Sequence, residues 1–131
     1  MAAIPQQYRD LFETKAFANL ATLRADGTAH VSPVWIDYDG RHLSFNSTRG
    51  RAKVRQIERD PRVTFSVQDP HNPYRYVEVR GHVVETTEKG ADAHIDALAK
   101  KYLGRDTYPF RRPGEVRVLI KVEPDSVHGQ P

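Results

Sequence analysis

Hydrophobic and polar residues alternate along much of this chain, and the alternation predicts half-buried strands. Six segments show it: residues 17–24, 30–37, 41–47, 62–68, 74–86 and 115–122. Alternation of this kind is typical of antiparallel sheets, in which one face packs on the core and the other meets solvent. The pattern therefore favours a mainly β protein with six strands.

Two Asp-Gly pairs beside these segments predict tight turns. Asp26-Gly27 separates the first two segments, and Asp39-Gly40 stands before the third. Asp-Gly is favoured in short hairpin turns because both residues tolerate positive φ angles. We expect the first three strands to pair in succession as an antiparallel meander. A bulge near Gly81, in the fifth segment, would exchange the two faces of the strand downstream.

Helical spacing of apolar residues marks three further segments: residues 5–13, 51–59 and 88–103. Pro5 suits the first turn of a helix, and Gly104 suits a helix C-terminus. Tight hairpins combined with crossing helices predict a closed or half-closed antiparallel barrel rather than a parallel sheet. We expect one domain over residues 1–131, with residues 1–14 as an appended helix.

Length and composition narrow the class of protein. The chain has 131 residues, of which 38% are hydrophobic and 28% charged, as in a soluble globular domain. No apolar run approaches the roughly 20 residues that span a membrane, and the N-terminal region lacks the apolar stretch of a signal peptide. We therefore expect a cytoplasmic protein with no membrane partner. The absence of cysteine excludes disulfides and thiol nucleophiles.

Positive charge is concentrated where a helix is predicted to begin. Arg51 and Lys53 follow Gly50 in the first turn of the segment 51–59. Cations there oppose the helix dipole and crowd unpaired N–H groups, whereas a bound anion would reverse that penalty. Phosphate is the natural candidate for such an anion. The alternative interpretation is a solvated basic face on a surface helix.

Other common sites are not indicated by the sequence. The histidines are scattered, with no pair at i, i+4 spacing, so we expect no metal site: His30, His42, His71, His82, His94 and His128. Neither a dinucleotide-binding fingerprint nor a Walker loop occurs. No serine–histidine–aspartate or paired-carboxylate arrangement is visible by spacing, and the catalytic residues stay unknown.

Five fragments, in their order and spacing, resemble a known family: Leu20–Gly27, Val31–Trp35, Arg51–Arg55, Asp60–Val63 and Tyr76–Gly81. Together they are similar to the pyridoxamine 5'-phosphate oxidase-like split-barrel family, and within it to the coenzyme F420-dependent, or deazaflavin, branch. The resemblance implies a six-stranded antiparallel split β-barrel of the FMN-binding type, with two or three flanking helices. It also implies a homodimer with the cofactor in a groove between subunits.

The same resemblance implies which residues hold the cofactor. Arg51 and Lys53 would bind its phosphate, helped by the backbone of Ala52. Two short segments would line the ring system and its side chain: Ser32, Pro33, Val34 and Trp35, and Asn46, Ser47 and Thr48. Tyr74 and Tyr76 of a second subunit would form the substrate side.

The implied activity is hydride transfer between reduced coenzyme F420 and a small conjugated organic acceptor. An FMN-dependent oxidase or reductase is an alternative, since a phosphate site suits either cofactor. A basic groove through Arg49 or Arg55 would favour F420, which has an acidic tail. A third alternative is a non-catalytic module that binds a cofactor or nucleic acid; nucleic acid is disfavoured because the aromatic residues do not cluster in the basic segment.

Overall fold

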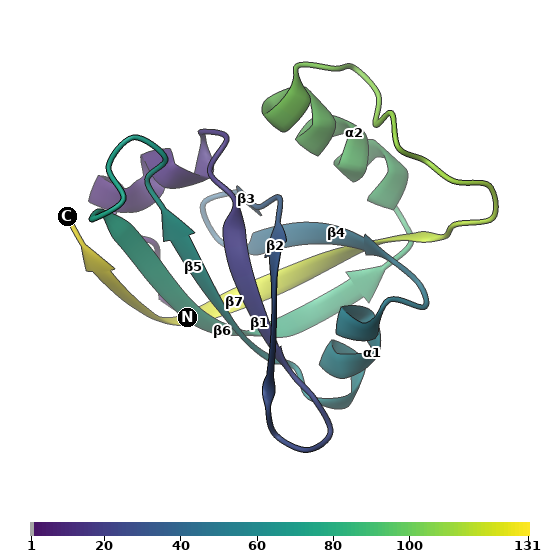
Figure 1. Ribbon diagram of the computed structural model, residues 1–131, viewed down its shortest axis with the longest axis horizontal. Coiled ribbons are helices and arrows are strands. Elements are labelled where there is room, and N and C mark those ends of the chain that lie inside the picture. Colours follow the sequence, from purple (N-terminus) through teal and green to yellow (C-terminus); the bar gives the residue numbers. More distant parts are fainter. Residues whose placement is uncertain (1) are drawn as a thin grey trace.

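The computed structural model describes residues 2–131, which form one curled, fully antiparallel sheet of seven strands in the order β2-β1-β5-β6-β7-β4-β3 (Figure 1). The strands are β1 (Ala18–Leu23), β2 (Ala29–Val34), β3 (Asp37–Tyr38), β4 (Leu43–Thr48), β5 (Arg62–Gln68), β6 (Tyr76–Thr87) and β7 (Arg117–Gln130). The expectation of a mainly β antiparallel protein is confirmed. The expected count of six strands is wrong by one, because the two-residue β3 is a strand of its own.

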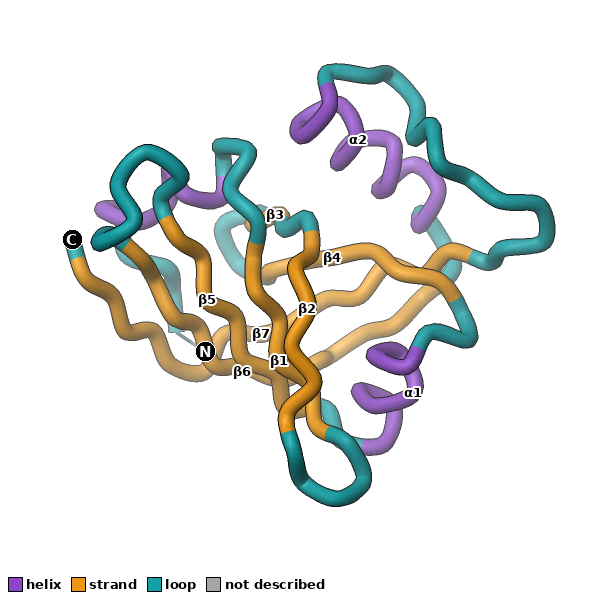
Figure 2. The backbone as a smooth tube through the Cα atoms, viewed as in Figure 1, coloured by secondary structure: helices purple, strands orange, loops and turns teal. Residues whose placement is uncertain are grey.

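The expected meander is also wrong. Both Asp-Gly turns form, and β1 pairs with β2 as predicted, but β4 pairs with β3 and β7 rather than with β2. The second strand ends at Val34, and only Trp35 and Ile36 separate it from β3 on the other edge of the sheet. This short link brings the two edges of the sheet together at one end and curls the sheet into a half-barrel (Figure 2).

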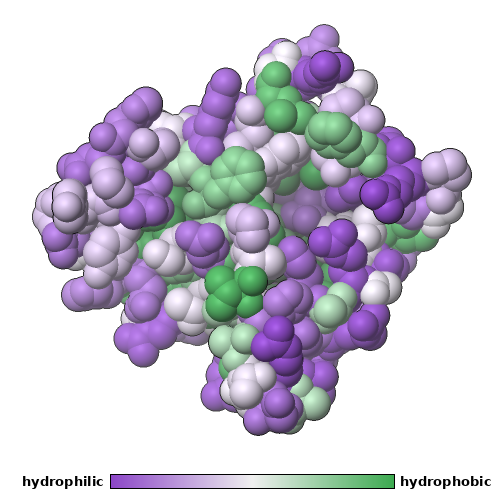
Figure 3. Space-filling model, viewed as in Figure 1, coloured by the Kyte–Doolittle hydropathy of each residue, from purple (hydrophilic) through white to green (hydrophobic). Residues whose placement is uncertain are grey.

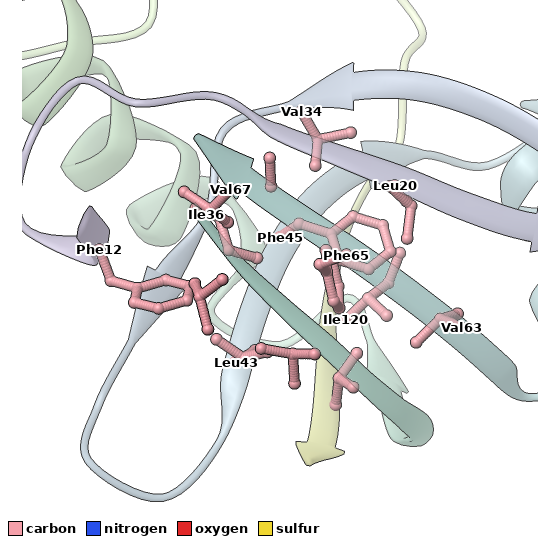
Figure 4. Close-up of a cluster of buried hydrophobic side chains, with 14 of the residues drawn as sticks. Phe12, Leu20, Val34, Ile36, Leu43, Phe45, Val63, Phe65, Val67 and Ile120 are labelled. Carbon is pink, nitrogen blue, oxygen red and sulfur yellow. The ribbon is translucent and has the colours of Figure 1, made fainter. Parts of the chain in front are cut away.

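The interior of the half-barrel is filled by the apolar residues of the alternating segments (Figure 4). Phe45 of β4 and Phe65 of β5 meet edge to face at its centre, with their ring centroids 6.0 Å apart. Leu20, Leu43 and Ile120 are fully buried around them. Sequence alternation therefore identified the core-facing side of these strands correctly.

The two longest strands, β6 and β7, depart from the predicted bounds. Gly81 lies at a shift in their pairing register, so the bulge that the sequence left open does form, and a second shift follows Val83. Strand β7 continues to Gln130, because its second half pairs with the first half of β6 although it lacks the alternation of apolar residues. Tyr74, expected at the start of β6, lies in the preceding turn and is exposed.

Three helices accompany the sheet: η1 (Gln6–Phe12), α1 (Ala52–Arg59) and α2 (Ala91–Leu103). The first is a 3-10 helix rather than an α-helix, and its apolar side chains are buried. Gly104 ends α2 in the left-handed conformation, as predicted. No helix in residues 2–131 is long and apolar enough to cross a membrane.

Helix α2 is attached to the sheet near its C-terminal end. The Tyr102 hydroxyl accepts a hydrogen bond from the backbone N–H of Ile36 (3.1 Å) and donates one to the carbonyl of Ala16 (2.7 Å). The Tyr102 ring stacks on Trp35 at a centroid distance of 5.1 Å. Lys101 donates to the carbonyl of Ile36 at 2.6 Å. These contacts fix α2 against the link that joins the two edges of the sheet.

Gly81→Ala should destabilise the protein by about 1–3 kcal/mol, because the added methyl group overpacks a crowded site. A Cβ at this position would lie 2.4 Å from the backbone oxygen of Glu123, which the strand ladder holds in place. Arg80→Ala, at the exposed neighbouring residue, is the matched control and should change stability little. Denaturant unfolding of the three proteins measures both effects, and equal stability of all three would contradict the assignment.

Candidate functional site

A pocket of about 640 Å³ lies between α1 and α2, where the ends of β2 and β4 diverge. Residues 108–117, which connect α2 to β7, form its outer side. Figure 3 shows the hollow below the surface formed by α2 and this connecting segment, with hydrophobic side chains above it and hydrophilic ones beneath. The volume is in the range of ordinary cofactor and substrate sites.

One side of the pocket carries positive charge at the beginning of α1. Gly50 takes a φ of +93°, which turns the chain from β4 into the helix and brings Arg51 and Lys53 to the pocket. Lys53 as a whole residue is only 7% exposed and opens to the pocket, and nothing in residues 2–131 offers it a hydrogen bond or a counterion. Burial, reinforced by the nearby Arg51 charge, lowers the pKa of Lys53.

The other cations of this segment are engaged elsewhere. Arg49 pairs with Glu58 at 3.0 Å and with Glu88 at 3.3 Å, and Arg55 donates to the carbonyl of Gly50. Neither Arg49 nor Arg55 lines the pocket. The charge that faces the pocket from α1 is therefore that of Arg51 and Lys53.

The opposite side of the pocket is aromatic. Trp35 stacks on Tyr102 and meets Tyr108 at nearly a right angle, with a centroid distance of 5.9 Å. Tyr108 is held from two sides: its N–H donates to Asp96 at 2.8 Å, and the Arg117 guanidinium lies 4.6 Å from its ring centroid. Such a wall offers flat apolar faces on which a planar ring can stack.

A polar row crosses the floor of the pocket. The Arg117 side chain is 10% exposed, and its Nε donates to Glu115 at 3.2 Å. Its Nη1 donates to the Oδ1 of Asn46 at 3.3 Å. All three side chains line the pocket, so the aromatic wall and the sheet floor are joined through Arg117.

Comparison with known proteins places these features in a family. Residues 4–130 match the pattern of pyridoxamine 5'-phosphate oxidase. The chain belongs to this family. A comparison with curated proteins finds no match.

Solved structures agree with the fold of the pyridoxamine 5'-phosphate oxidase family. A protein named F420 reductase is 38% identical, with 95% of this chain and 98% of that protein covered and a TM-score of 0.84. A conserved hypothetical protein from Mycobacterium tuberculosis is 20% identical, with 96% and 84% covered and a TM-score of 0.78. General Stress Protein 26 from Bacillus anthracis is 21% identical, with 92% and 88% covered and a TM-score of 0.67. The last two show likeness of fold alone, and the expected split barrel is confirmed.

Most of the residues that the family resemblance indicated do come together. Eight of them line the pocket: Pro33, Val34, Trp35, Asn46, Ser47, Thr48, Arg51 and Lys53. Ser32 and Ala52 are adjacent in sequence to lining residues but do not line it themselves. Tyr76 pairs with Gln68 and Gln130 at the start of β6, outside the pocket of its own chain. The roles of these residues in binding stay predictions.

Sequence reasoning missed the outer side of the pocket altogether. Tyr108, Phe110 and Arg112 line the pocket from the segment between α2 and β7, where the sequence indicated no site residue. Tyr108 and Phe110 pack edge to face, and Phe110 is still 61% exposed. Two aromatic residues spaced by one proline in a polar loop were the signal that could have drawn attention to this segment.

One cluster among the described residues has the composition of a cation site. It consists of His82, Glu123 and Asp125, at the register shifts of β6 and β7. The Nδ1 of His82 lies 2.8 Å from Asp125, and its Nε2 lies 3.7 Å from Glu123. Both ring nitrogens already face carboxylates, and this pairing accounts for the cluster without an ion.

Lys53→Met should stabilise the ligand-free protein at pH 7 by about 0.5–2 kcal/mol, because it removes a buried charge but keeps the packing. The pKa of Lys53 is lowered in the folded state, so its positive charge destabilises the folded protein at neutral pH. As the pH rises through that pKa towards 10.5, the folded protein loses the proton first, and wild-type stability should approach that of the variant.

Thermal unfolding at pH 7 and at alkaline pH measures this difference. Lys89→Met, at an exposed lysine, is the control and should show neither the gain nor its pH dependence. A Lys53 variant less stable than the wild type at pH 7 would show that the lysine has a stabilising partner.

Proposed function

We propose that this protein is a coenzyme F420-dependent oxidoreductase that transfers a hydride between the reduced deazaflavin and a small conjugated organic acceptor. The observation that carries the proposal is Lys53, a buried cation that lines the pocket and has no counterion within residues 2–131. A buried charge of this kind is costly unless a partner of opposite charge reaches it. The partner that fits is a ligand phosphate.

The residues at the start of α1 suit a phosphate group in several ways. Lys53 and Arg51 supply charge-assisted hydrogen bonds, and the first N–H groups of the helix have no carbonyl partner within it. No acidic side chain caps this end of α1 or lies in its first turn. The phosphate of F420 would therefore be held by Arg51, Lys53 and the Ala52 backbone.

Two observations favour F420 over FMN as the cofactor. The chain is 38% identical to a protein named F420 reductase. Coenzyme F420 also carries an acidic tail, and Arg112 lines the outer side of the pocket as an exposed cation with no side-chain partner in residues 2–131. Arg112 thus takes the part that the sequence suggested for Arg49 or Arg55. FMN, which lacks such a tail, would leave Arg112 unused.

The remaining lining residues are arranged to orient a ring and to exclude water from it. Trp35 and Tyr108 offer apolar faces for stacking, while Asn46, Ser47 and Thr48 offer hydrogen bonds from β4. When bound, the cofactor supplies the carbon that carries the hydride, so the protein needs no acid, base or metal of its own for that transfer. The contribution of this chain is binding, orientation and a dry surrounding.

If Arg51 and Lys53 bind the phosphate, the double variant Arg51→Ala, Lys53→Ala should bind the cofactor at least tenfold more weakly. Charge-assisted contacts of this kind contribute about 1.5–3 kcal/mol each. Fluorescence or calorimetric titration with F420 and with FMN in one buffer measures it. Arg55→Ala removes a cation from the same helix but outside the pocket, and should leave affinity nearly unchanged.

The pair of titrations also decides the cofactor. Micromolar binding of F420 with much weaker binding of FMN supports the proposal, and turnover of reduced F420 with a quinone then tests the reaction. Tighter binding of FMN would assign the protein to flavin chemistry instead. Binding of neither, or equal affinity in the double variant, would refute the phosphate site.

We further propose a homodimer, in which Tyr74 and Tyr76 reach the pocket of a second copy. Neither tyrosine lines the pocket of its own chain, and Tyr74 is 79% exposed. Sedimentation should give twice the chain mass of 14.9 kDa. Tyr76→Phe should lower turnover and leave cofactor affinity intact. The control is Tyr38→Phe, at a tyrosine outside the pocket whose hydroxyl is bonded within its own chain. A monomer, or full turnover in the Tyr76 variant, would contradict this arrangement.

A further inference from the structure

A half-buried histidine on α2 contacts the floor of the pocket from behind. The Nδ1 of His94 lies 3.1 Å from the side-chain nitrogen of Asn46, and its Nε2 lies 3.1 Å from the Oγ of Ser44. His94 itself does not line the pocket, whereas Asn46 does. The hydrogen-bonded link from His94 to the pocket therefore runs through Asn46.

The neighbours of Asn46 fix the orientation of its amide. The Nδ2 of Asn46 lies 2.9 Å from the carbonyl oxygen of Ala91, which can only accept a hydrogen bond. Its Oδ1 faces the Nη1 of Arg117, which can only donate. Because the Nδ2 group is a donor, the Nδ1 of His94 must accept from it. The imidazole is thus neutral, with its proton on Nε2 and donated to Ser44.

We propose that His94 is a positioning residue for the pocket: its neutral Nε2–H form holds Asn46, and through Asn46 also Arg117 and Tyr108, in the arrangement that binds the ligand. The identity of that ligand rests on the proposed function, but the arrangement itself does not. Protonation of His94 at Nδ1 would then weaken ligand binding.

The reason is a conflict between donors. With a proton on Nδ1, His94 and the amide nitrogen of Asn46 would point hydrogen atoms at each other. Rotating the Asn46 amide would relieve this contact, but it would turn the amide nitrogen towards the Arg117 guanidinium and the amide oxygen towards the Ala91 carbonyl. Without rotation the bond between His94 and Asn46 is lost, and with rotation the bond between Asn46 and Arg117 is lost. After rotation, Arg117, which lies over Tyr108, would be bonded only to Glu115.

The charges around His94 set the pH at which His94 gains its second proton. Burial is the largest influence and lowers the pKa of His94 below its usual 6.5. Asp37 of β3 opposes this lowering, whereas Lys121 of β7 adds to it. Arg117 of β7, which reaches Asn46, also carries positive charge. The neutral form therefore prevails at pH 7, and the pocket loses its arrangement only in mild acid.

The experiment compares the wild type with two variants in titrations with F420 between about pH 5 and pH 8, the range in which histidines change charge. In the wild type, affinity should fall by up to about tenfold for each pH unit below the pKa of His94, because binding excludes one proton. His94→Asn keeps an acceptor close to the position of Nδ1 but does not titrate, so its affinity should match the wild type at pH 8 and stay flat. His94→Leu removes the acceptor and should bind weakly at every pH. An identical pH profile in the wild type and His94→Asn would overturn the proposal.

A second measurement needs no ligand and so separates this proposal from the proposed function. Nitrogen chemical shifts of the imidazole in the ligand-free wild type should show the Nε2–H form at pH 7. The emission of Trp35, the single tryptophan of the chain, should change as His94 is protonated, because Trp35 contacts Tyr108. His94→Asn should lack that transition. A proton on Nδ1 at pH 7, or the same transition in the variant, would refute the positioning role even if no cofactor bound.

Discussion

The two-residue link between β2 and β3 is the constraint on which the rest of this structure depends. These strands are the two edges of the sheet, yet Val34 and Asp37 cannot lie more than about 11 Å apart along three trans peptide units. The sheet must therefore curl until its edges almost meet. The link is itself buried at Ile36, and Tyr102 supplies the hydrogen bond that its backbone N–H needs. The same contact places α2 beside the opening, where it becomes a wall of the pocket.

The pocket gathers groups that a stable fold would otherwise avoid. Lys53 is buried without a counterion in the described chain, and the half-buried His94 stands behind the floor of the pocket between polar neighbours. The core on the other side of β4 is, by contrast, built from apolar side chains around Phe45 and Phe65. Local costs concentrated in a cavity, with a regular core nearby, are typical of sites organised for a ligand. The pocket and the core share strand β4: Leu43 and Phe45 belong to the core, whereas Asn46, Ser47 and Thr48 line the pocket.

Local signals in the sequence predicted local structure well. Asp26-Gly27 predicted the hairpin of β1 and β2. The bulge left open at Gly81 forms at a position where only glycine fits beside the backbone of Glu123. The partner of β4 could not be predicted in the same way, since a turn at Asp39-Gly40 fixes the direction of the chain but not its next neighbour. The extension of β7 was missed because its pairing with β6 is main-chain bonding, which leaves no apolar pattern.

In the candidate site, too, the parts marked by local sequence signals were predicted, and the parts formed by distant residues were not. The positive side of the pocket was predicted from charge placed after Gly50, and the residues of β2 and β4 from family resemblance. The outer wall was not predicted, because Tyr108 takes its position from Asp96 and Arg117, contacts that form only when the chain folds. His94 looked like a scattered histidine for the same reason: its partners, Ser44 and Asn46, lie some fifty positions away.

The place of β7 in the sheet affects how the protein can fold during its synthesis. This strand comes last along the chain, yet it lies between β6 and β4 and joins the two halves of the sheet. Until it emerges, β4 has only the two-residue β3 beside it, and Ile120 is missing from the core. Contacts so distant in sequence form late and slowly. Before β7 is synthesised, one side of the hydrophobic core is exposed to solvent. Pairing of β7 with β4 and β6 then completes the sheet and covers the core.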